Sequence, residues 1–448
     1  MMKKKLSLST TQTIMLSFLC AILLGSLLLS LPISSASGKA VPYLDALFTA
    51  TTATCVTGLV TVPTVTTWSV FGQVVILVLI QIGGLGVITI LSSVMILLHK
   101  RMGLGGRLLL QDAFNLNSLA GIVQFVKKVM LGTFLVEGIG AILYMTVFIP
   151  EFGLKGIWIS VFTAISAFCN AGIDIIDVNS LCNYATNPII NFVTGALIIL
   201  SGIGYIVWWD VLRTGKKSGK WWKHLTFHSK IAITTTLILI FGGGLLIFLF
   251  EYDNPATIGN MGLFDKIQVS LFQSITTRTA GFASVPQQDL TNGSSILCLL
   301  LMFIGGSPVG TAGGIKTVTF AVLVVSAMAT IQNKNEVTIF HRNIPKQAIN
   351  KAVAVTAMSF GILFVSTLLL TAVTDADSLD ILYETVSATA TVGLTRNLTG
   401  QLNGIGKAII IATMYLGRVG PISLALALNS SKKNQNIITN PTEEISVG

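Results

Sequence analysis

The sequence contains few charged residues. Asp, Glu, Lys and Arg make up 10% of its 448 residues, whereas an ordinary soluble domain contains about 25%. A chain with so little charge cannot cover a water-exposed surface, which excludes an ordinary soluble protein and indicates a surface covered largely by lipid. The net charge of +10 does not indicate nucleic-acid binding, because the basic residues cluster in loops between apolar runs.

Cysteine and histidine are also scarce. The five cysteines are scattered and form no CxxC pair, which argues against a disulfide framework or a zinc site. The four histidines fall in segments assigned to the cytoplasmic side. No nucleophile stands beside a base, and no metal ligands cluster, within an apolar run. The sequence therefore predicts a protein that is not an enzyme.

Long apolar runs occupy most of the chain. Each is long enough to cross about 30 Å of hydrocarbon, and one of them is interrupted by the glycine-rich segment 305–314. Shorter semi-apolar segments alternate with these runs and end in glycine-containing loops, as re-entrant half-helices do. The sequence predicts an all-α integral membrane protein with eight transmembrane helices at 13–33, 71–98, 129–150, 188–212, 228–250, 295–331, 350–374 and 405–429, and half-helices at 43–54, 157–169, 264–277 and 380–390.

The distribution of charge predicts the orientation. Basic residues gather in the loops that join one helix pair to the next, and acidic residues gather on the opposite side. The basic loops and both termini are expected to be cytoplasmic, so the half-helices enter from outside. An acidic outer vestibule would concentrate cations. The alternative is that these carboxylates are ordinary solvated loop charges.

The loops that follow the half-helices repeat one pattern. Each carries a small or β-branched residue, then glycine, then a large apolar residue, and the glycines at 58, 172, 281 and 393 are separated by 114, 109 and 112 residues. Internal repetition in phase with the hydropathy pattern indicates tandem units. We expect repeat 1 at 1–112, repeat 2 at 113–222, repeat 3 at 223–335 with a gating loop at 305–314, repeat 4 at 336–430, and a C-terminal tail at 431–448.

Four such loops around a pseudo-fourfold axis have the chemistry of a potassium-selectivity filter. A potassium ion sheds water only where other oxygens replace it, and backbone carbonyls of a short extended segment do this. Glycine permits the backbone angles required, and the C-terminal end of each half-helix favours a cation. The predicted filter residues are Val56, Thr57, Gly58, Leu59, Asn170, Ala171, Gly172, Ile173, Thr279, Ala280, Gly281, Phe282, Thr391, Val392, Gly393 and Leu394.

Several motifs resemble those of the Trk/Ktr/HKT superfamily of potassium transporters, and the layout resembles its bacterial KtrB membrane subunits. The matching segments are QIGGLG at 81–86, NAG at 170–172, TTRTAGF at 276–282, GGSP with TAGGIKT at 305–317, and GRVGP at 417–421. The resemblance covers nearly the whole chain. It implies potassium uptake across the bacterial cytoplasmic membrane by a homodimer with one pore per chain. It also implies a cytoplasmic nucleotide-binding regulatory partner of the KtrA type, and sodium as a coupling or activating ion.

The resemblance further implies that the interrupting loop of repeat 3 is a gate beneath the filter. The residues carried over are Gly305, Gly306, Gly310, Thr311, Gly313, Gly314 and Lys316, with Arg418 as the basic residue that contacts the loop. The residues themselves leave alternatives open. Gly-Gly-Ser-Pro cannot continue a helix; the alternative to a gate is a simple kink, and the alternative role of Lys316 is to extend to the cytoplasmic interface. Glu137, within a span, is either a hydrogen-bonding group or part of a coupling site.

A coupled carrier is a second function that the sequence leaves open beside a pore. A coupled carrier with alternating access would be favoured by inverted repeats, whereas these repeats run in parallel and every half-helix enters from the same side.

The resemblance also indicates which ion is transported, because serine at the filter glycine of repeat 1 is associated with sodium permeation in the superfamily. Gly58 occupies that position here, which predicts a preference for potassium over sodium.

Overall fold

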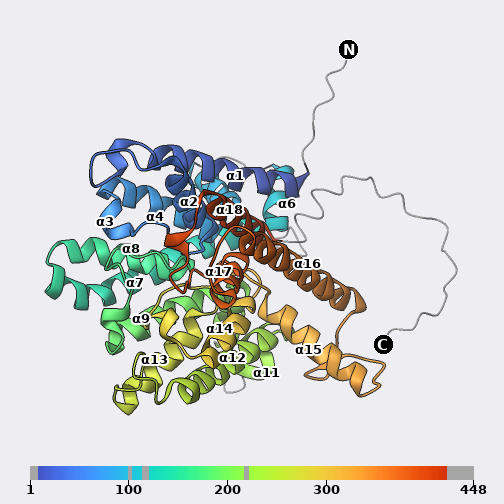
Figure 1. Ribbon diagram of the computed structural model, residues 1–448. Coiled ribbons are helices and arrows are strands. Elements are labelled where there is room, and N and C mark those ends of the chain that lie inside the picture. The colour runs from blue at the N-terminus through green and yellow to red at the C-terminus, as the bar shows by residue number, and fades with distance from the viewer. Residues whose placement is uncertain (1–8, 99–102, 114–120, 216–220, 421–448) are drawn as a thin grey trace.

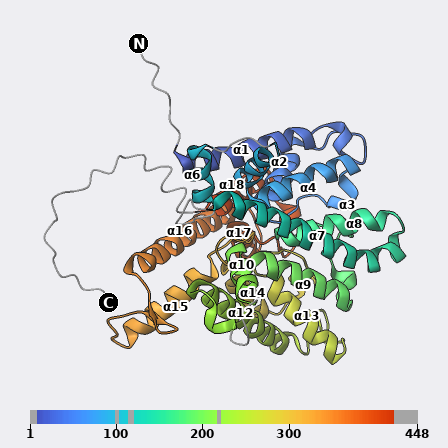
Figure 2. The same cartoon turned by 180° about the vertical axis from the view of Figure 1, so that it is seen from behind.

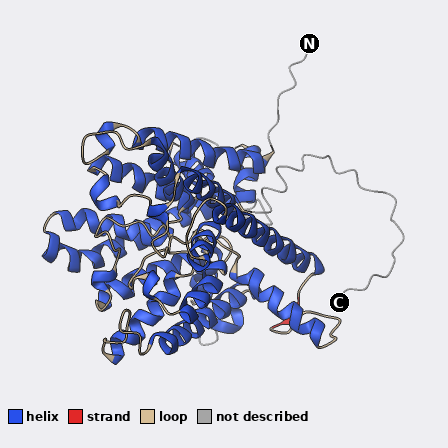
Figure 3. Cartoon of the chain, viewed as in Figure 1, coloured by secondary structure: helices blue, strands red, loops and turns tan. Residues whose placement is uncertain are grey.

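The computed structural model describes residues 9–98, 103–113, 121–215 and 221–420, and these form helices almost throughout (Figures 1 and 3). The exception is a short antiparallel hairpin of β1 (Thr338–Ile339) and β2 (Arg342–Asn343). The all-α expectation is confirmed.

Long helices begin each of the four expected units. These are α1 (Thr10–Leu29), α7 (Ile122–Phe152), α12 (Phe227–Glu251) and α16 (Lys346–Thr371), each long and apolar enough to cross a membrane. They carry exposed leucine, isoleucine and phenylalanine side chains such as Leu131 and Ile238. A surface of this kind is expected to face lipid rather than water.

A short buried helix follows each long one. These are α2 (Tyr43–Cys55), α8 (Lys155–Cys169), α13 (Leu263–Thr276) and α17 (Ser378–Ala390), and each packs against the long helix of its own unit. The bounds lie within two residues of the predicted half-helices. The units follow one another around the centre of the molecule, where α17 also contacts α18 (Figures 1 and 2).

The second helices of the units are broken rather than straight. A 97° bend separates α4 (Val70–Leu85) from α5 (Val87–Leu97), and a 95° bend separates α9 (Pro188–Gly202) from α10 (Tyr205–Thr214). The predicted spans at 71–98 and 188–212 therefore each contain a sharp bend. The breaks lie at Gly86 and Gly204, whose φ angles of 86° and 93° do not occur within a helix.

In the third unit, α14 (Asn292–Phe303) and α15 (Thr317–Ile331) are separated by the glycine-rich loop. In the fourth, α18 (Gly404–Val419) ends at Gly420, whose φ is 89°. The remainder of the expected span 405–429 lies outside the described residues. Four helices of the described chain are long enough to cross a membrane, or six if each bent pair is one span, so the count of eight stays a prediction.

Shorter elements complete the described chain. They are α3 (Thr64–Thr67), α6 (Leu104–Ala113), α11 (Trp221–His224) and the 3-10 turns η1 (Pro32–Ser34), η2 (Cys182–Tyr184), η3 (Gln287–Asp289) and η4 (Thr399–Gln401). Turn η1 lies between the long and short helices of the first unit, and the other three turns follow the short helices of the second, third and fourth units.

Candidate ion-binding site

The residue two positions before each filter glycine has the same unusual backbone conformation. Val56, Asn170 and Thr391 directly follow their helices with φ angles of 55°, 59° and 52°, and Thr279 of repeat 3 has a φ of 65°. Left-handed residues other than glycine are uncommon and cost about 1–3 kcal/mol each. Their recurrence in all four units indicates that this turn positions the loop that follows.

The four predicted filter glycines meet in a closed ring. A Cβ atom on Gly58 would lie 2.6 Å from the carbonyl oxygen of Ala171, and one on Gly172 would lie 2.6 Å from that of Ala280. The other two glycines continue the ring in the same direction. A Cβ atom on Gly281 would meet the carbonyl oxygen of Val392 in repeat 4, and one on Gly393 would meet that of Thr57 in repeat 1. The loops therefore surround one axis in the order of repeats 1, 2, 3 and 4.

Backbone hydrogen bonds tie each loop to its own short helix. The N–H of Thr57 donates to the Thr52 carbonyl (2.9 Å), and the N–H of Val392 donates to the Ser387 carbonyl (2.8 Å). Repeats 2 and 3 make the same bonds, from Ala171 to Ser166 (2.8 Å) and from Ala280 to Thr276 (3.0 Å). The carbonyl oxygens of the same stretch face the glycines of the neighbouring loops, and carbonyls gathered around one axis are the groups that can replace water around a cation.

Sequence reasoning missed a second set of residues at this site. Each short helix presents a buried hydroxyl to its own loop, and we call these the anchor hydroxyls: Thr52, Ser166, Thr276 and Ser387. They stand six residues before the filter glycine in repeats 1, 2 and 4 and five residues before it in repeat 3. Aligning the repeats on their glycines reveals this position.

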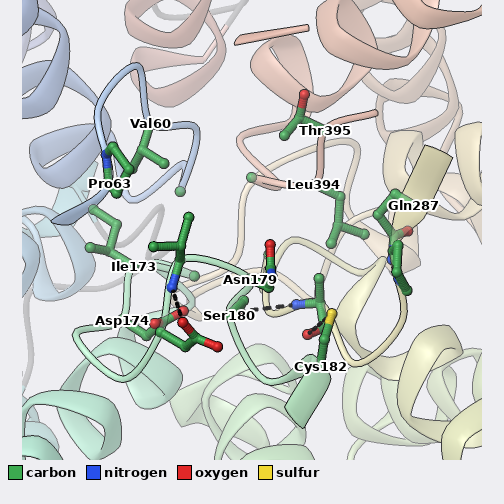
Figure 4. Close-up of a pocket in the computed structure, with 18 of the residues that line it drawn as sticks. Val60, Pro63, Ile173, Asp174, Asn179, Ser180, Cys182, Gln287, Leu394 and Thr395 are labelled. Atoms are coloured by element: carbon green, nitrogen blue, oxygen red, sulfur yellow. Dashed lines mark hydrogen bonds between the residues drawn. The ribbon is translucent and has the colours of Figure 1, made fainter. Parts of the chain in front are cut away.

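A cavity of about 310 Å³ opens on one side of the ring (Figure 4). All four filter glycines line it, together with Asp174 and Asp177. The N–H of Ile176 donates to Asp174 at 3.2 Å, and burial raises the pKa of the Asp174 carboxyl to about 6. The other acidic residues of the expected vestibule do not line this cavity, and two of them are paired: Asp45 with Lys407 and Asp380 with Arg396.

The glycine-rich loop of repeat 3 lies against the other side of the ring. Thr311 Oγ1 donates to the Phe168 carbonyl (3.2 Å), and the Gly313 N–H donates to Thr279 Oγ1 (3.2 Å). Gly313 also abuts Thr391, because a Cβ atom there would meet the hydroxyl of that side chain. The loop thus contacts the filter segments of repeats 3 and 4 and the C-terminal end of α8 in repeat 2.

The same loop is too long and too well bonded to be a simple kink. It separates helices that end at Phe303 and begin at Thr317. The Ser307 N–H donates to the Gly202 carbonyl (2.7 Å), and the Tyr205 N–H donates to the Val309 carbonyl (3.0 Å). The break between α9 and α10 therefore supplies the backbone groups that hold the loop.

Two basic side chains bind the loop directly. Arg418 donates to the Thr311 carbonyl (2.7 Å) and to the Gly83 carbonyl (2.6 Å), which joins the loop to repeats 1 and 4. Lys316 donates to the Ala312 carbonyl (2.6 Å) rather than extending to an interface. The expected contact between Arg418 and the loop is present, and its role in gating stays a prediction.

Glu137 lies behind the ring, between repeats 1 and 2. Gln81 Nε2 donates to its Oε1 atom at 3.1 Å, and the Cys169 thiol lies 4.0 Å from the same oxygen. Among the described residues no basic side chain forms an ion pair with it. The geometry fits the hydrogen-bonding alternative.

Comparisons with known proteins show which family the chain resembles. The family described as TrkH, cation transport protein, matches residues 4–437. Ktr system potassium uptake protein B of Bacillus subtilis (strain 168) is 40% identical over 438 residues, covering 98% of this chain and 96% of the relative. Potassium/sodium uptake protein NtpJ of Enterococcus hirae is 37% identical over 458 residues, covering 100% and 99%.

The fold is also similar to a solved structure. The crystal structure of the potassium transporter TrkH from Vibrio parahaemolyticus superposes with a TM-score of 0.75 and 18% identity, over 95% of this chain and 86% of that one. Together with the match of the family over nearly the whole sequence, this places the chain, by both sequence and fold, in the TrkH family of cation transport proteins.

Proposed function

We propose that this chain is the ion-conducting subunit of a potassium uptake system in the bacterial cytoplasmic membrane. The observation that carries the proposal is the closed ring of filter glycines, in which each glycine faces a carbonyl oxygen of the next repeat. Relatives that match the chain along its full length are named as uptake proteins for potassium or for potassium and sodium.

In this proposal the chain consists of four repeats with two transmembrane helices each, and the termini are cytoplasmic. A cation enters the cavity beside Asp174 and passes the ring of loop carbonyls, which replace its water. It then meets the glycine-rich loop of repeat 3. Because that loop lies across the inner side of the ring and contacts two filter segments and the end of α8, we assign it the role of the gate.

Arg418 is the residue that we expect to hold the gate closed. Its guanidinium donates to carbonyl oxygens of the loop and of repeat 1 at the same time. Hydrogen bonds from a charged donor contribute about 1.5–3 kcal/mol, so losing them favours the open state. Lys316 stiffens the loop from within by binding the Ala312 carbonyl.

The remaining parts of the proposal follow from the relatives. Membrane subunits of Ktr systems imply a regulatory component, which we expect to be a cytoplasmic nucleotide-binding protein of the KtrA type acting on a homodimer of this chain. The naming of the Enterococcus relative as a potassium/sodium uptake protein supports sodium as the coupling or activating ion.

Flux into liposomes that contain only the purified chain tests the proposal. We expect potassium uptake that persists against excess external sodium and increases when the regulatory partner is added. A variant with the gate shortened by deleting residues 309–313 should conduct without the partner. Absence of potassium flux in both the partner-bound protein and the shortened variant would contradict the proposal.

A further inference from the structure

The anchor hydroxyls are used in two opposite ways. Thr52 accepts a hydrogen bond from the Gly58 N–H (2.9 Å), and Ser387 accepts one from the Gly393 N–H (2.9 Å). In repeats 2 and 3 the hydroxyl is a donor to the residue after the filter glycine, from Ser166 to the Ile173 carbonyl (2.5 Å) and from Thr276 to the Phe282 carbonyl (2.7 Å). The four loops are therefore not equivalent.

The backbone angles of the glycines divide in the same way. Gly58 and Gly393 have φ angles of 101° and 102°, whereas Gly172 and Gly281 have 62° and 84°. Repeats 1 and 4 are neighbours in the ring, as are repeats 2 and 3. The hydrogen bonds thus divide the ring into two unlike halves, and the larger φ angles of Gly58 and Gly393 are consistent with that division.

This division decides which carbonyls face the axis at the outer end of the ring. We call the carbonyls of the residues after the filter glycines the post-glycine carbonyls: Leu59, Ile173, Phe282 and Leu394. Those of repeats 2 and 3 are bound by hydroxyls on helices behind the loops. A carbonyl that points back to its helix does not point to the axis. Within the described chain, no hydrogen bond engages those of repeats 1 and 4.

We propose that the outermost cation site is one-sided: the post-glycine carbonyls of repeats 1 and 4 bind the ion, and the anchor hydroxyls of repeats 2 and 3 withhold the other two. This inference rests on the proposed function, because it concerns the same filter. The missing ligands are water molecules from the cavity, which Ile173 and Leu394 line (Figure 4). The buried Asp174 follows Ile173 and supplies negative charge to the half that lacks carbonyls.

A one-sided site has a consequence for uptake. The entering ion keeps part of its hydration shell, so binding at the mouth is weak and release toward the inner sites is fast. Conduction requires this balance, because a site that binds too tightly retains its ion. Freeing a withheld carbonyl should therefore strengthen binding at the entrance.

Two serines at equivalent positions provide the test. Ser166→Ala frees the Ile173 carbonyl, and we expect the KM for potassium uptake to fall about fivefold, the effect of about one net hydrogen bond. The maximal rate should fall as well, because the ion leaves the entrance more slowly. Ser387→Ala makes the same chemical change but removes the acceptor of the Gly393 N–H. It should lower the maximal rate without lowering KM. Ser166→Thr keeps the hydroxyl and should restore the wild-type KM.

Equal effects of the two alanine substitutions, or a higher KM in Ser166→Ala, would overturn the inference. Anomalous scattering from thallium in crystals gives a second readout that does not depend on a variant. The outermost peak should lie off the axis toward repeats 1 and 4, and a peak on the axis would contradict the proposal. Wild-type potassium flux in the same liposomes tests the proposed function separately, so a conducting protein with an axial peak refutes only the inference.

Discussion

Replacing Gly58 by serine should weaken the preference for potassium over sodium. Gly58 has a φ of 101°, and a Cβ atom there would lie 2.6 Å from the Ala171 carbonyl oxygen and 3.1 Å from the Gly393 Cα atom. Because all of these atoms belong to the backbone of the ring, a serine side chain fits only if the loops of repeats 1, 2 and 4 move.

The size of the effect follows from the strain. A residue other than glycine in a sparsely populated backbone region costs about 1–3 kcal/mol, and about 1.4 kcal/mol corresponds to a tenfold change in an equilibrium. The strain is relieved by widening the ring, which removes the geometry that favours a dehydrated potassium ion. We expect the ratio of potassium to sodium flux to fall by about tenfold or more.

The assay is flux of each ion into liposomes, with Gly38→Ser as the matched control. Gly38 also has a positive φ, of 69°, but no atom lies within 4 Å of the position of its Cβ. It therefore tests backbone strain without intrusion into the ring. An unchanged flux ratio in Gly58→Ser, or an equal loss in the control, would refute the assignment of the filter.

Three further predictions concern the gate, the cavity and the packing of the repeats. Deleting residues 309–313 should raise potassium flux in the absence of a partner, and an unaltered flux in a folded protein would refute the gate. Burial raises the pKa of Asp174 to about 6, so the carboxyl loses its charge as pH falls, and uptake should decrease between about pH 7.5 and about 5.5. Asp174→Asn should remove that dependence, and persistence of the same pH profile would contradict the role. Lys407→Met breaks the 2.6 Å ion pair with Asp45 between repeats 4 and 1 and should lower the melting temperature by about 3 °C. An unchanged melting temperature would contradict the prediction that this ion pair stabilises the packing of the two repeats.

The sequence predicted the parts of the fold that repeat. The short helices were predicted within two residues because each is bounded by a change in hydropathy and by a glycine loop, as α2 is at Cys55 and Gly58. The expected positions of the filter glycines also meet around one axis. These features depend on local pattern, which four copies make visible.

The bends at Gly86 and Gly204 were not predicted, because a glycine in an apolar run is compatible with a straight helix. Only the tertiary structure shows that the second break is where the Tyr205 N–H binds the loop of repeat 3. The roles of the anchor hydroxyls were not predicted for a similar reason. Serine and threonine are frequent in these helices, and the partner of each hydroxyl is decided by the turn of the loop rather than by spacing.

The contacts of the repeat 3 loop have a strength suited to a switch. Gly313 makes one hydrogen bond to the filter segment of repeat 3, Thr311 makes one to the end of α8, and Arg418 makes one charged hydrogen bond to the loop. At about 0.5–1.5 kcal/mol for each neutral bond and about 1.5–3 for the charged one, they sum to a few kcal/mol. Moving a two-state equilibrium from almost closed to almost open takes about 5.5 kcal/mol. In the proposed gating, a regulatory partner that prefers the open state by that amount would move the loop away from these three contacts, and the bonds of Ser307 and Val309 to the break between α9 and α10 would keep it attached.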